Sequence, residues 1–107
     1  MTLENLGQET SPGTFYHRIY DAREVKIDRY IVRPGVTAPF HGNANDEAYT
    51  LVACTTLKFL SVSEDGRINE YRHMEPGEQL KRPRGFRHTL INVSDRDFVV
   101  LKIWPTA

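Results

Sequence analysis

Short runs of β-branched and aromatic residues, each followed by turn residues, dominate this chain and limit the folds open to it. Such runs are typical of β-strands, whose pleated surface accommodates branched and aromatic side chains. Between two of them lies Asp65-Gly66, the strongest short signal for a tight hairpin, and Gly, Pro, Asn and Asp mark the other breaks. Strands are therefore expected at residues 14–20, 24–33, 47–53, 55–63, 67–73, 88–94 and 97–104.

Helices are not expected to contribute to the fold. No segment of about 10 or more residues keeps the apolar period of a helix. We therefore expect seven to nine strands and at most one turn of helix. Many short strands separated by turn residues indicate an all-β fold, either a sandwich or an antiparallel barrel.

The chain has the length of one domain. Its 107 residues and 12.3 kDa are near the common domain size, which buries a core without disulfides or metals as staples. Residues 1–13 are polar and are expected to form a flexible or loosely docked N-terminal arm. The β-barrel domain is accordingly assigned to residues 14–107.

Charge and cysteine content exclude several classes of function. The 14 Lys and Arg residues balance the 14 Asp and Glu residues, so no overall field attracts nucleic acid or an anionic membrane. The single cysteine, Cys54, has no intrachain disulfide partner, and the N-terminus lacks the basic and apolar regions of a secretory signal. No apolar run approaches the roughly 20 residues that span a bilayer. We expect a cytoplasmic protein with no nucleic-acid or membrane partner.

Two spaced motifs stand out among the turns. The first runs Gly35, five residues, His41, one residue, Asn43, three residues, Glu47, six residues and Cys54. The second runs Gly77, five residues, Pro83, one residue, Gly85, two residues, His88, three residues and Asn92. On an all-β chain, these motifs resemble the two signatures of the cupin family. The second fits at every fixed position, whereas in the first Asn43 replaces the second histidine and Cys54 replaces the closing glycine.

The resemblance covers residues 25–104 and implies a small jelly-roll β-barrel that holds a metal through three histidines and a glutamate. Carried over position by position, it assigns His41, Glu47 and His88 as the metal ligands. Imidazole nitrogens and one carboxylate suit a divalent transition metal such as Fe(II), Mn(II), Ni(II), Cu(II) or Zn(II). Asn43 is a poor metal ligand compared with imidazole, so weaker metal binding is expected, or none. Its side chain is instead expected to hydrogen-bond the substrate or a metal-bound water.

Candidate catalytic residues lie on the strand after the first motif. Alternate residues of a strand share a face, so Glu47 and Tyr49 are expected side by side in the barrel. Either side chain then moves a proton of the substrate. The structural alternative for Glu47 is an ion pair with an arginine on a neighbouring strand.

Candidate anion-binding residues are cationic. The cluster before His88, Lys81 to Arg87, is interpreted either as an electropositive rim for a carboxylate or phosphate, or as a solvated loop whose charges offset nearby acidic residues. On the first interpretation Arg84 and Arg87 bind substrate. Arg29 is a second anchor if its face of the strand 24–33 points inward; if the opposite face does, Tyr30 and Val32 pack the core instead.

The sequence thus predicts a metal-dependent cupin-type enzyme that acts on a small polar, anionic molecule. Isomerases or epimerases, lyases, cyclases and dioxygenases are all represented among the small members of the family. The alternative is a non-catalytic small-ligand-binding cupin that has lost its metal, which the departures at Asn43 and Cys54 favour. A homodimer is expected from the family and from residues 97–104, a strand that is apolar on both faces except at Lys102.

Overall fold

The computed structural model describes residues 6–42, 47–67 and 69–105, and these residues form ten strands. Every strand pairing in it is antiparallel. The strands are β1 (Gln8–Ser11), β2 (Thr14–Asp21), β3 (Val25–Val32), β4 (Thr37–His41), β5 (Tyr49–Ala53), β6 (Leu57–Val62), β7 (Asn69–Met74), β8 (Gln79–Arg82), β9 (His88–Asn92) and β10 (Phe98–Pro105).

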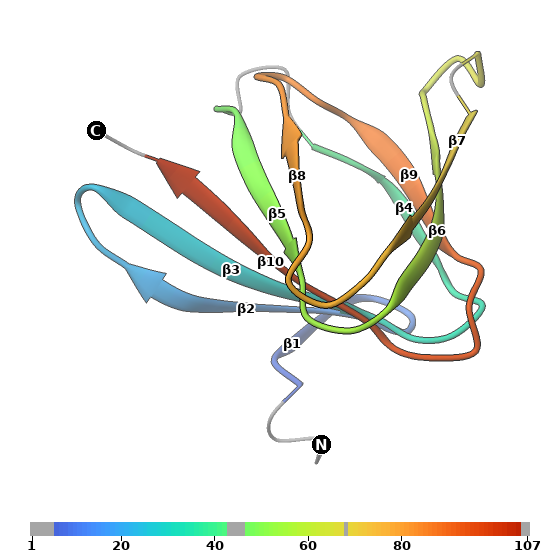
Figure 1. Ribbon diagram of the computed structural model, residues 1–107, viewed down its shortest axis with the longest axis horizontal. Helices are drawn as coiled ribbons and strands as arrows, with labels where there is room; N and C mark the ends of the chain where they lie inside the picture. The colour runs from blue at the N-terminus through green and yellow to red at the C-terminus, as the bar shows by residue number, and fades with distance from the viewer. Residues whose placement is uncertain (1–5, 43–46, 68, 106–107) are drawn as a thin grey trace.

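The strands make two sheets that form the opposite walls of a barrel (Figure 1). The larger sheet has the order β1-β2-β3-β10-β5-β8 and the smaller one has the order β4-β9-β6-β7. Late strands lie between early ones in both sheets, as in a jelly roll. The predicted all-β, antiparallel jelly-roll fold is therefore confirmed. Among the described residues, no helix is long and apolar enough to span a bilayer.

Seven strands match the predicted runs, and three further strands, β1, β4 and β8, were not predicted from the sequence. All three are only four or five residues long, and β1 and β8 lie at the edges of their sheet. Their sequences, QETS, TAPFH and QLKR, carry few β-branched residues. Such short edge strands depend on their neighbours rather than on intrinsic propensity, so the pattern of the sequence does not reveal them.

Part of the predicted N-terminal arm lies against the barrel. β1 pairs with β2, and Leu6 ahead of it is 1% exposed. Hydrogen bonds of the β1–β2 ladder and burial of the leucine side chain dock this part of the arm on the barrel. Residues 1–5 lie outside the described residues.

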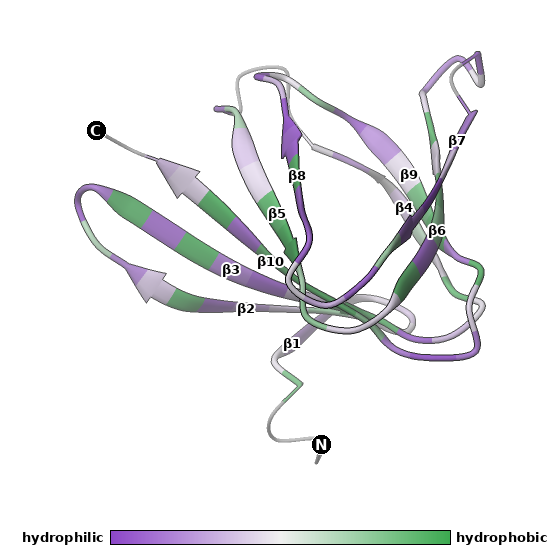
Figure 2. Ribbon diagram, viewed as in Figure 1, coloured by the Kyte–Doolittle hydropathy of each residue, from purple (hydrophilic) through white to green (hydrophobic). Residues whose placement is uncertain are grey.

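The core fills the space between the two sheets. Strands β5, β6, β9 and β10 alternate between buried and more exposed residues, because successive side chains of a strand point to opposite faces. Figure 2 shows hydrophobic and hydrophilic segments alternating along β3. Phe59 of the smaller sheet meets Phe98 of the larger one edge to face, with ring centroids 5.3 Å apart. These faces define which side chains reach the interior.

The inward face of β3 carries Asp28, Tyr30 and Val32. Tyr30 and Val32 line the interior cavity described below, so the second of the two interpretations of this strand holds. Arg29 belongs to the opposite face, because neighbouring residues of a strand alternate. The structure thus does not bring Arg29 to the cavity.

Buried Asp28 links three neighbouring strands of the larger sheet. Its carboxylate accepts hydrogen bonds from Tyr16 Oη at 3.1 Å, Arg18 Nε at 2.7 Å and Trp104 Nε1 at 2.9 Å. Burial alone would raise the pKa of Asp28, but these donors, and above all the Arg18 guanidinium, outweigh burial and hold the pKa below its ordinary value. The network fixes β2, β3 and β10 to one another beside the cavity.

Asn92, the last residue of the second motif, has a structural role. Its side chain is fully buried, with 0% exposure. The amide donates to the carbonyls of Val32, Arg33 and Arg96 at 2.8–3.2 Å, and its oxygen accepts from the backbone N–H and the hydroxyl of Ser94. One side chain therefore satisfies the backbone at the ends of β3 and β9 that would otherwise be buried without partners.

Replacing Asn92 by alanine is expected to lower the free energy of unfolding by about 2–4 kcal/mol, because several buried carbonyls lose their donor at once. Denaturant unfolding followed by circular dichroism measures this change. Asn69→Ala, at an exposed position on β7, is the matched control and should change stability by less than about 0.5 kcal/mol. Equal effects of the two substitutions would contradict the role given to Asn92.

Candidate functional site

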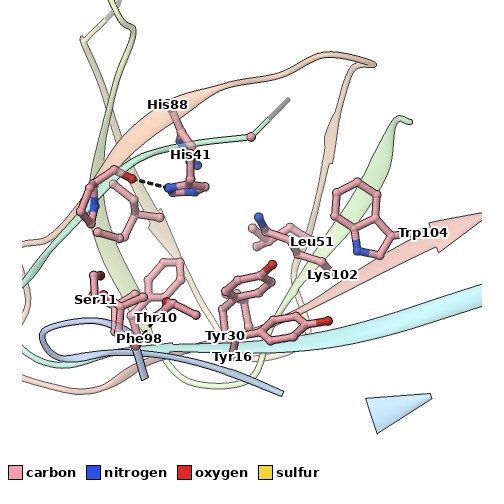
Figure 3. Close-up of a pocket in the computed structure, with 17 residues that line it drawn as sticks. Thr10, Ser11, Tyr16, Tyr30, His41, Leu51, His88, Phe98, Lys102 and Trp104 are labelled. Carbon is pink, nitrogen blue, oxygen red and sulfur yellow. Dashed lines mark hydrogen bonds between the residues drawn. The ribbon is translucent and has the colours of Figure 1, made fainter. Parts of the chain in front are cut away.

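A cavity of about 470 Å³ opens between the two sheets and is lined mostly by apolar and aromatic side chains. Its volume is in the range of small-molecule sites. Phe98, Leu51 and Val100 form part of its wall, and β1 contributes Thr10 and Ser11. Figure 3 shows His41 and His88 together on one side, with Lys102 and Trp104 extending from the other.

His41 and His88 stand next to each other because β4 pairs with β9. The two residues are partners in the strand register, and their rings meet edge to face with centroids 4.5 Å apart. A bulge between Ala38 and His41 turns the end of β4, and bulges of this kind re-aim side chains. Gly42 follows at φ 104°, where a Cβ would lie 2.5 Å from the carbonyl oxygen of Phe86. Glycine at this position lets the chain pass close to the segment that leads into His88.

Hydrogen bonds to Nδ1 hold both imidazole rings in place. His41 Nδ1 donates to the Pro39 carbonyl at 2.8 Å, which leaves Nε2 of this ring as its acceptor. His88 Nδ1 lies 2.8 Å from Ser61 Oγ. With Nδ1 engaged in each ring, Nε2 is the nitrogen available for a ligand.

Polar contacts link His88 through Ser61 to Arg82 and Glu70. Arg82, buried on β8, donates through Nη2 to Ser61 Oγ at 3.4 Å and to Glu70 Oε1 at 3.2 Å. Its guanidinium also lies over the Phe86 ring, 4.2 Å from the centroid. Arg82 was predicted as part of a rim cluster, but the structure buries it with Glu70, so it positions Ser61 and His88 instead.

Both imidazoles are neutral at physiological pH. Burial is the main cause and lowers the pKa of His41 to about 4, with a further lowering by the Lys102 ammonium and a small opposite effect of the Pro39 carbonyl. Burial also lowers the pKa of His88 to about 2, together with the charges of His41, Lys102 and Arg82. The pair therefore offers neutral nitrogens rather than imidazolium charges.

Lys102, on the inner face of β10, supplies the positive charge of the opposite wall. Its Nζ lies 4.4 Å from the centroid of the Tyr30 ring, 4.8 Å from that of Tyr49 and 6.0 Å from that of Trp104. Aromatic faces attract a cation at such distances. In the sequence Lys102 was only an exception in an apolar strand, although its place between Val100 and Trp104 on one face was a usable signal.

The predicted anion-binding arginines lie on the surface. Arg84 donates through Nη1 to Glu47 Oε1 at 2.9 Å, and Arg87 lies 3.7 Å from Glu64. All four side chains are largely exposed. For these two arginines the contacts match the second interpretation, in which the charges of the cluster offset nearby acidic residues. Asn43, predicted to bind the substrate, lies outside the described residues.

The predicted metal ligands are brought together only in part. His41 and His88 meet, but the Glu47 carboxylate is 58% exposed and bound to Arg84. Within residues 6–42, 47–67 and 69–105, no three His, Cys, Asp or Glu side chains are grouped as a metal site requires. The Lys102 ammonium, close enough to lower both imidazole pKa values, further disfavours a dication. The described residues therefore do not fit a complete metal site.

The two predicted catalytic residues, Glu47 and Tyr49, lie in different surroundings. Tyr49 is buried against Trp104, with ring centroids 4.6 Å apart, whereas Glu47 is bound on the surface. The structure thus buries Tyr49 in the barrel, outside the residues that line the cavity, and leaves Glu47 on the surface.

The two neutral imidazoles should make the protein less stable in mild acid. The unfolded chain protonates histidine near pH 6.5, whereas the folded pKa values of about 4 and 2 lie below this value. Stability is therefore expected to fall as the pH drops below about 6.5, by roughly 1–2 kcal/mol per imidazole at pH 5. Denaturant unfolding at pH 7 and pH 5, in the presence of a chelator, measures the loss.

The variant His41→Gln/His88→Gln is the comparison for this experiment. Glutamine keeps hydrogen-bonding capacity but does not titrate, so most of the pH-dependent loss should disappear in the double variant. An unchanged pH dependence of stability would show that these imidazoles are not the groups held neutral.

Solved structures resemble this fold closely. A cupin domain from Bordetella pertussis superimposes with a TM-score of 0.77 at 27% identity, covering 94% of this chain and 100% of that one. KdgF from a Halomonas species gives 0.71 at 15% identity, covering 100% and 91%. Oxalate oxidase in complex with the substrate analogue glycolate gives 0.68 at 19% identity, covering 98% of this chain and 58% of that one.

In sequence comparison, no family model and no curated protein matches the chain. The structural likeness nevertheless agrees with the fold, with the second motif around His88 and with the imidazole pair at the cavity. The resemblance inferred from the two motifs is confirmed at the level of the domain: the chain is a small cupin-type β-barrel domain.

Proposed function

We propose that this chain is a cupin that binds a small molecule in its cavity, with a polar group of the ligand against His41 and His88. The observation that carries the proposal is the pair of neutral imidazoles in an otherwise largely apolar cavity of about 470 Å³. Neutral imidazole nitrogens can donate to or accept from a ligand without the cost of desolvating a charge. The aromatic and aliphatic walls take the apolar part of the ligand.

Binding is supported better than acid–base catalysis by the imidazoles. A general acid or base works best with a pKa near the operating pH. Imidazoles whose pKa values are about 4 and 2 are weak bases at neutral pH. If the chain is an enzyme, as an isomerase, lyase, cyclase or dioxygenase, proton transfer falls to another group, for which Tyr49 is our candidate inside the barrel.

The structural neighbours support a small-molecule occupant. One is a polyketide cyclase from Streptomyces resistomycificus, with a TM-score of 0.68, and oxalate oxidase was solved with the small hydroxy acid glycolate. These activities are those of the neighbours. For this chain they support an organic ligand of the barrel interior and do not select a reaction.

The experiment is a fragment screen read by the fluorescence of Trp104. This residue is the single tryptophan of the chain and lines the cavity, so its emission reports directly on occupancy. We expect some fragments to change the emission saturably. Ala38→Phe, which fills the cavity from its wall, should abolish the response, and Lys81→Met, at an exposed position on β8, should preserve it. The proposal would be contradicted if no fragment of the panel gave a response that Ala38→Phe removes.

A metal-dependent enzyme is the second candidate function, favoured by the hydrogen bonds that fix Nδ1 of both rings. Second-shell bonds of this kind orient metal-binding histidines. When bound, a divalent transition metal would be held by His41, His88 and a Glu47 released from Arg84, and would polarise a carbonyl or carboxylate of the substrate.

Elemental analysis of untagged protein tests this second candidate. Near-stoichiometric metal that is lost in both His88→Ala and Glu47→Ala would establish it. Arg84→Ala is the informative control, because freeing Glu47 from its ion pair should raise metal affinity if Glu47 is a ligand. Metal below about a tenth of an equivalent, with no uptake of added Fe(II), Mn(II), Ni(II), Cu(II) or Zn(II), would exclude it.

Self-association and cellular location complete the proposal. A cytoplasmic homodimer is what the sequence predicts. The outer face of β10 supports the dimer, since its residues Val99, Leu101 and Ile103 stay only half-buried in the single chain. Sedimentation equilibrium at micromolar concentration distinguishes a dimer from a 12.3 kDa monomer.

A further inference from the structure

We infer that Lys102 is the anion-binding residue of the cavity and that the ligand is a compact carboxylate with an apolar body. This inference rests on the proposed function, which places a small molecule in the cavity, and it adds the ligand's charge and the residue that recognises it. The rim arginines were the sequence-based candidates for this task.

The pleat of β10 forces Lys102 inward. Phe98 and Val100 occupy the same face as Lys102, and both are buried in the core. Because the side-chain period of a strand is two, these residues bring Lys102 to the interior, where it is 8% exposed. A cation on an inner face is costly to bury. Such a local conflict between sequence and fold is expected at functional sites.

Aromatic rings surround the Lys102 ammonium. Three aromatic rings, those of Tyr30, Tyr49 and Trp104, lie within 6.0 Å of its Nζ. Their negative faces stabilise a cation and offer nothing comparable to a neutral amine. This aromatic cage suits a lysine that binds an anion, whereas a nucleophilic lysine requires the neutral amine.

Lys102 is the charged side chain of the cavity lining as the structure describes it. The other described residues of the lining are apolar, aromatic, hydroxyl-bearing or histidine residues, with no further Lys, Arg, Asp or Glu among them. Asp28 lies opposite Lys102 in the β3–β10 register, but its oxygens accept hydrogen bonds from Tyr16, Arg18 and Trp104. An ammonium group inside low-dielectric walls attracts an anion more strongly than it would in water.

The lining also defines the rest of the ligand. Leu51, Leu90 and Phe98 form apolar walls that suit a hydrocarbon body. The imidazoles of His41 and His88, on the side away from Lys102 in Figure 3, suit a hydroxyl or keto group. A carboxylate at Lys102 and a second polar group at the imidazoles describe a small hydroxy or keto acid.

The experiment compares cyclohexanecarboxylate with its neutral isostere cyclohexanecarboxamide, using Trp104 fluorescence to measure both dissociation constants. The wild-type protein should bind the acid on the order of 10-fold more tightly than the amide, because a charge-assisted bond is formed only with the acid. Lys102→Met should remove this preference and leave amide affinity within about 3-fold of wild type, because methionine retains the apolar stem and lacks the charge. Lys81→Met and Arg84→Met should bind both compounds like the wild type.

The outcomes separate this inference from the proposed function. Saturable binding of the amide with equal affinity for the acid would overturn the role of Lys102 and leave the small-molecule cavity standing. Loss of the acid preference in Arg84→Met rather than in Lys102→Met would assign the anion to the rim and overturn the inference. Absence of binding by both compounds to the wild type would overturn the inference itself. Because the acid–amide comparison uses the wild-type protein, equal affinities would overturn the inference even if Lys102→Met does not fold.

Discussion

Strand β10 is the constraint on which the rest of the molecule depends. It lies between β3 and β5 in the larger sheet, and its inward face runs from the core, at Phe98 and Val100, to the cavity, at Lys102 and Trp104. The alternation of the strand couples these places, since Phe98 and Val100 cannot be buried without turning Lys102 inward. The aromatic rings beside Nζ then compensate for part of the cost of burying the charge.

The opposite wall depends on the β4–β9 pairing in the same way. The register of these strands places His41 beside His88, while Asn92 at the end of β9 fixes the backbone on which the register depends. The second motif therefore combines two kinds of residue: Asn92 holds the fold and His88 faces the cavity. The two walls together bring two imidazoles and one ammonium to the cavity, and we propose that they bind a small organic anion rather than a metal cation.

The sequence was sufficient for the fold because strand patterns and motif spacing are local signals. The seven longer strands, the hairpin at Asp65-Gly66 and the interior positions of His41 and His88 were all predicted in this way. The short strands β1, β4 and β8 were not, since pairing with neighbours rather than propensity forms them. The positions of the charged side chains were not predicted either, because they depend on tertiary contacts. Glu47 pairs with Arg84, Arg82 is buried with Glu70, and Lys102 lines the cavity.

A crystal structure of the protein grown with cyclohexanecarboxylate and Zn(II), with data collected at the zinc absorption edge, distinguishes an anion site at Lys102 from a metal centre at the imidazoles. We expect a carboxylate oxygen within hydrogen-bonding distance of Lys102 Nζ, no anomalous peak between His41 and His88, and Glu47 still bound to Arg84. An anomalous peak coordinated by His41, His88 and Glu47 would contradict the anion site and would establish the metal centre that the two motifs predict.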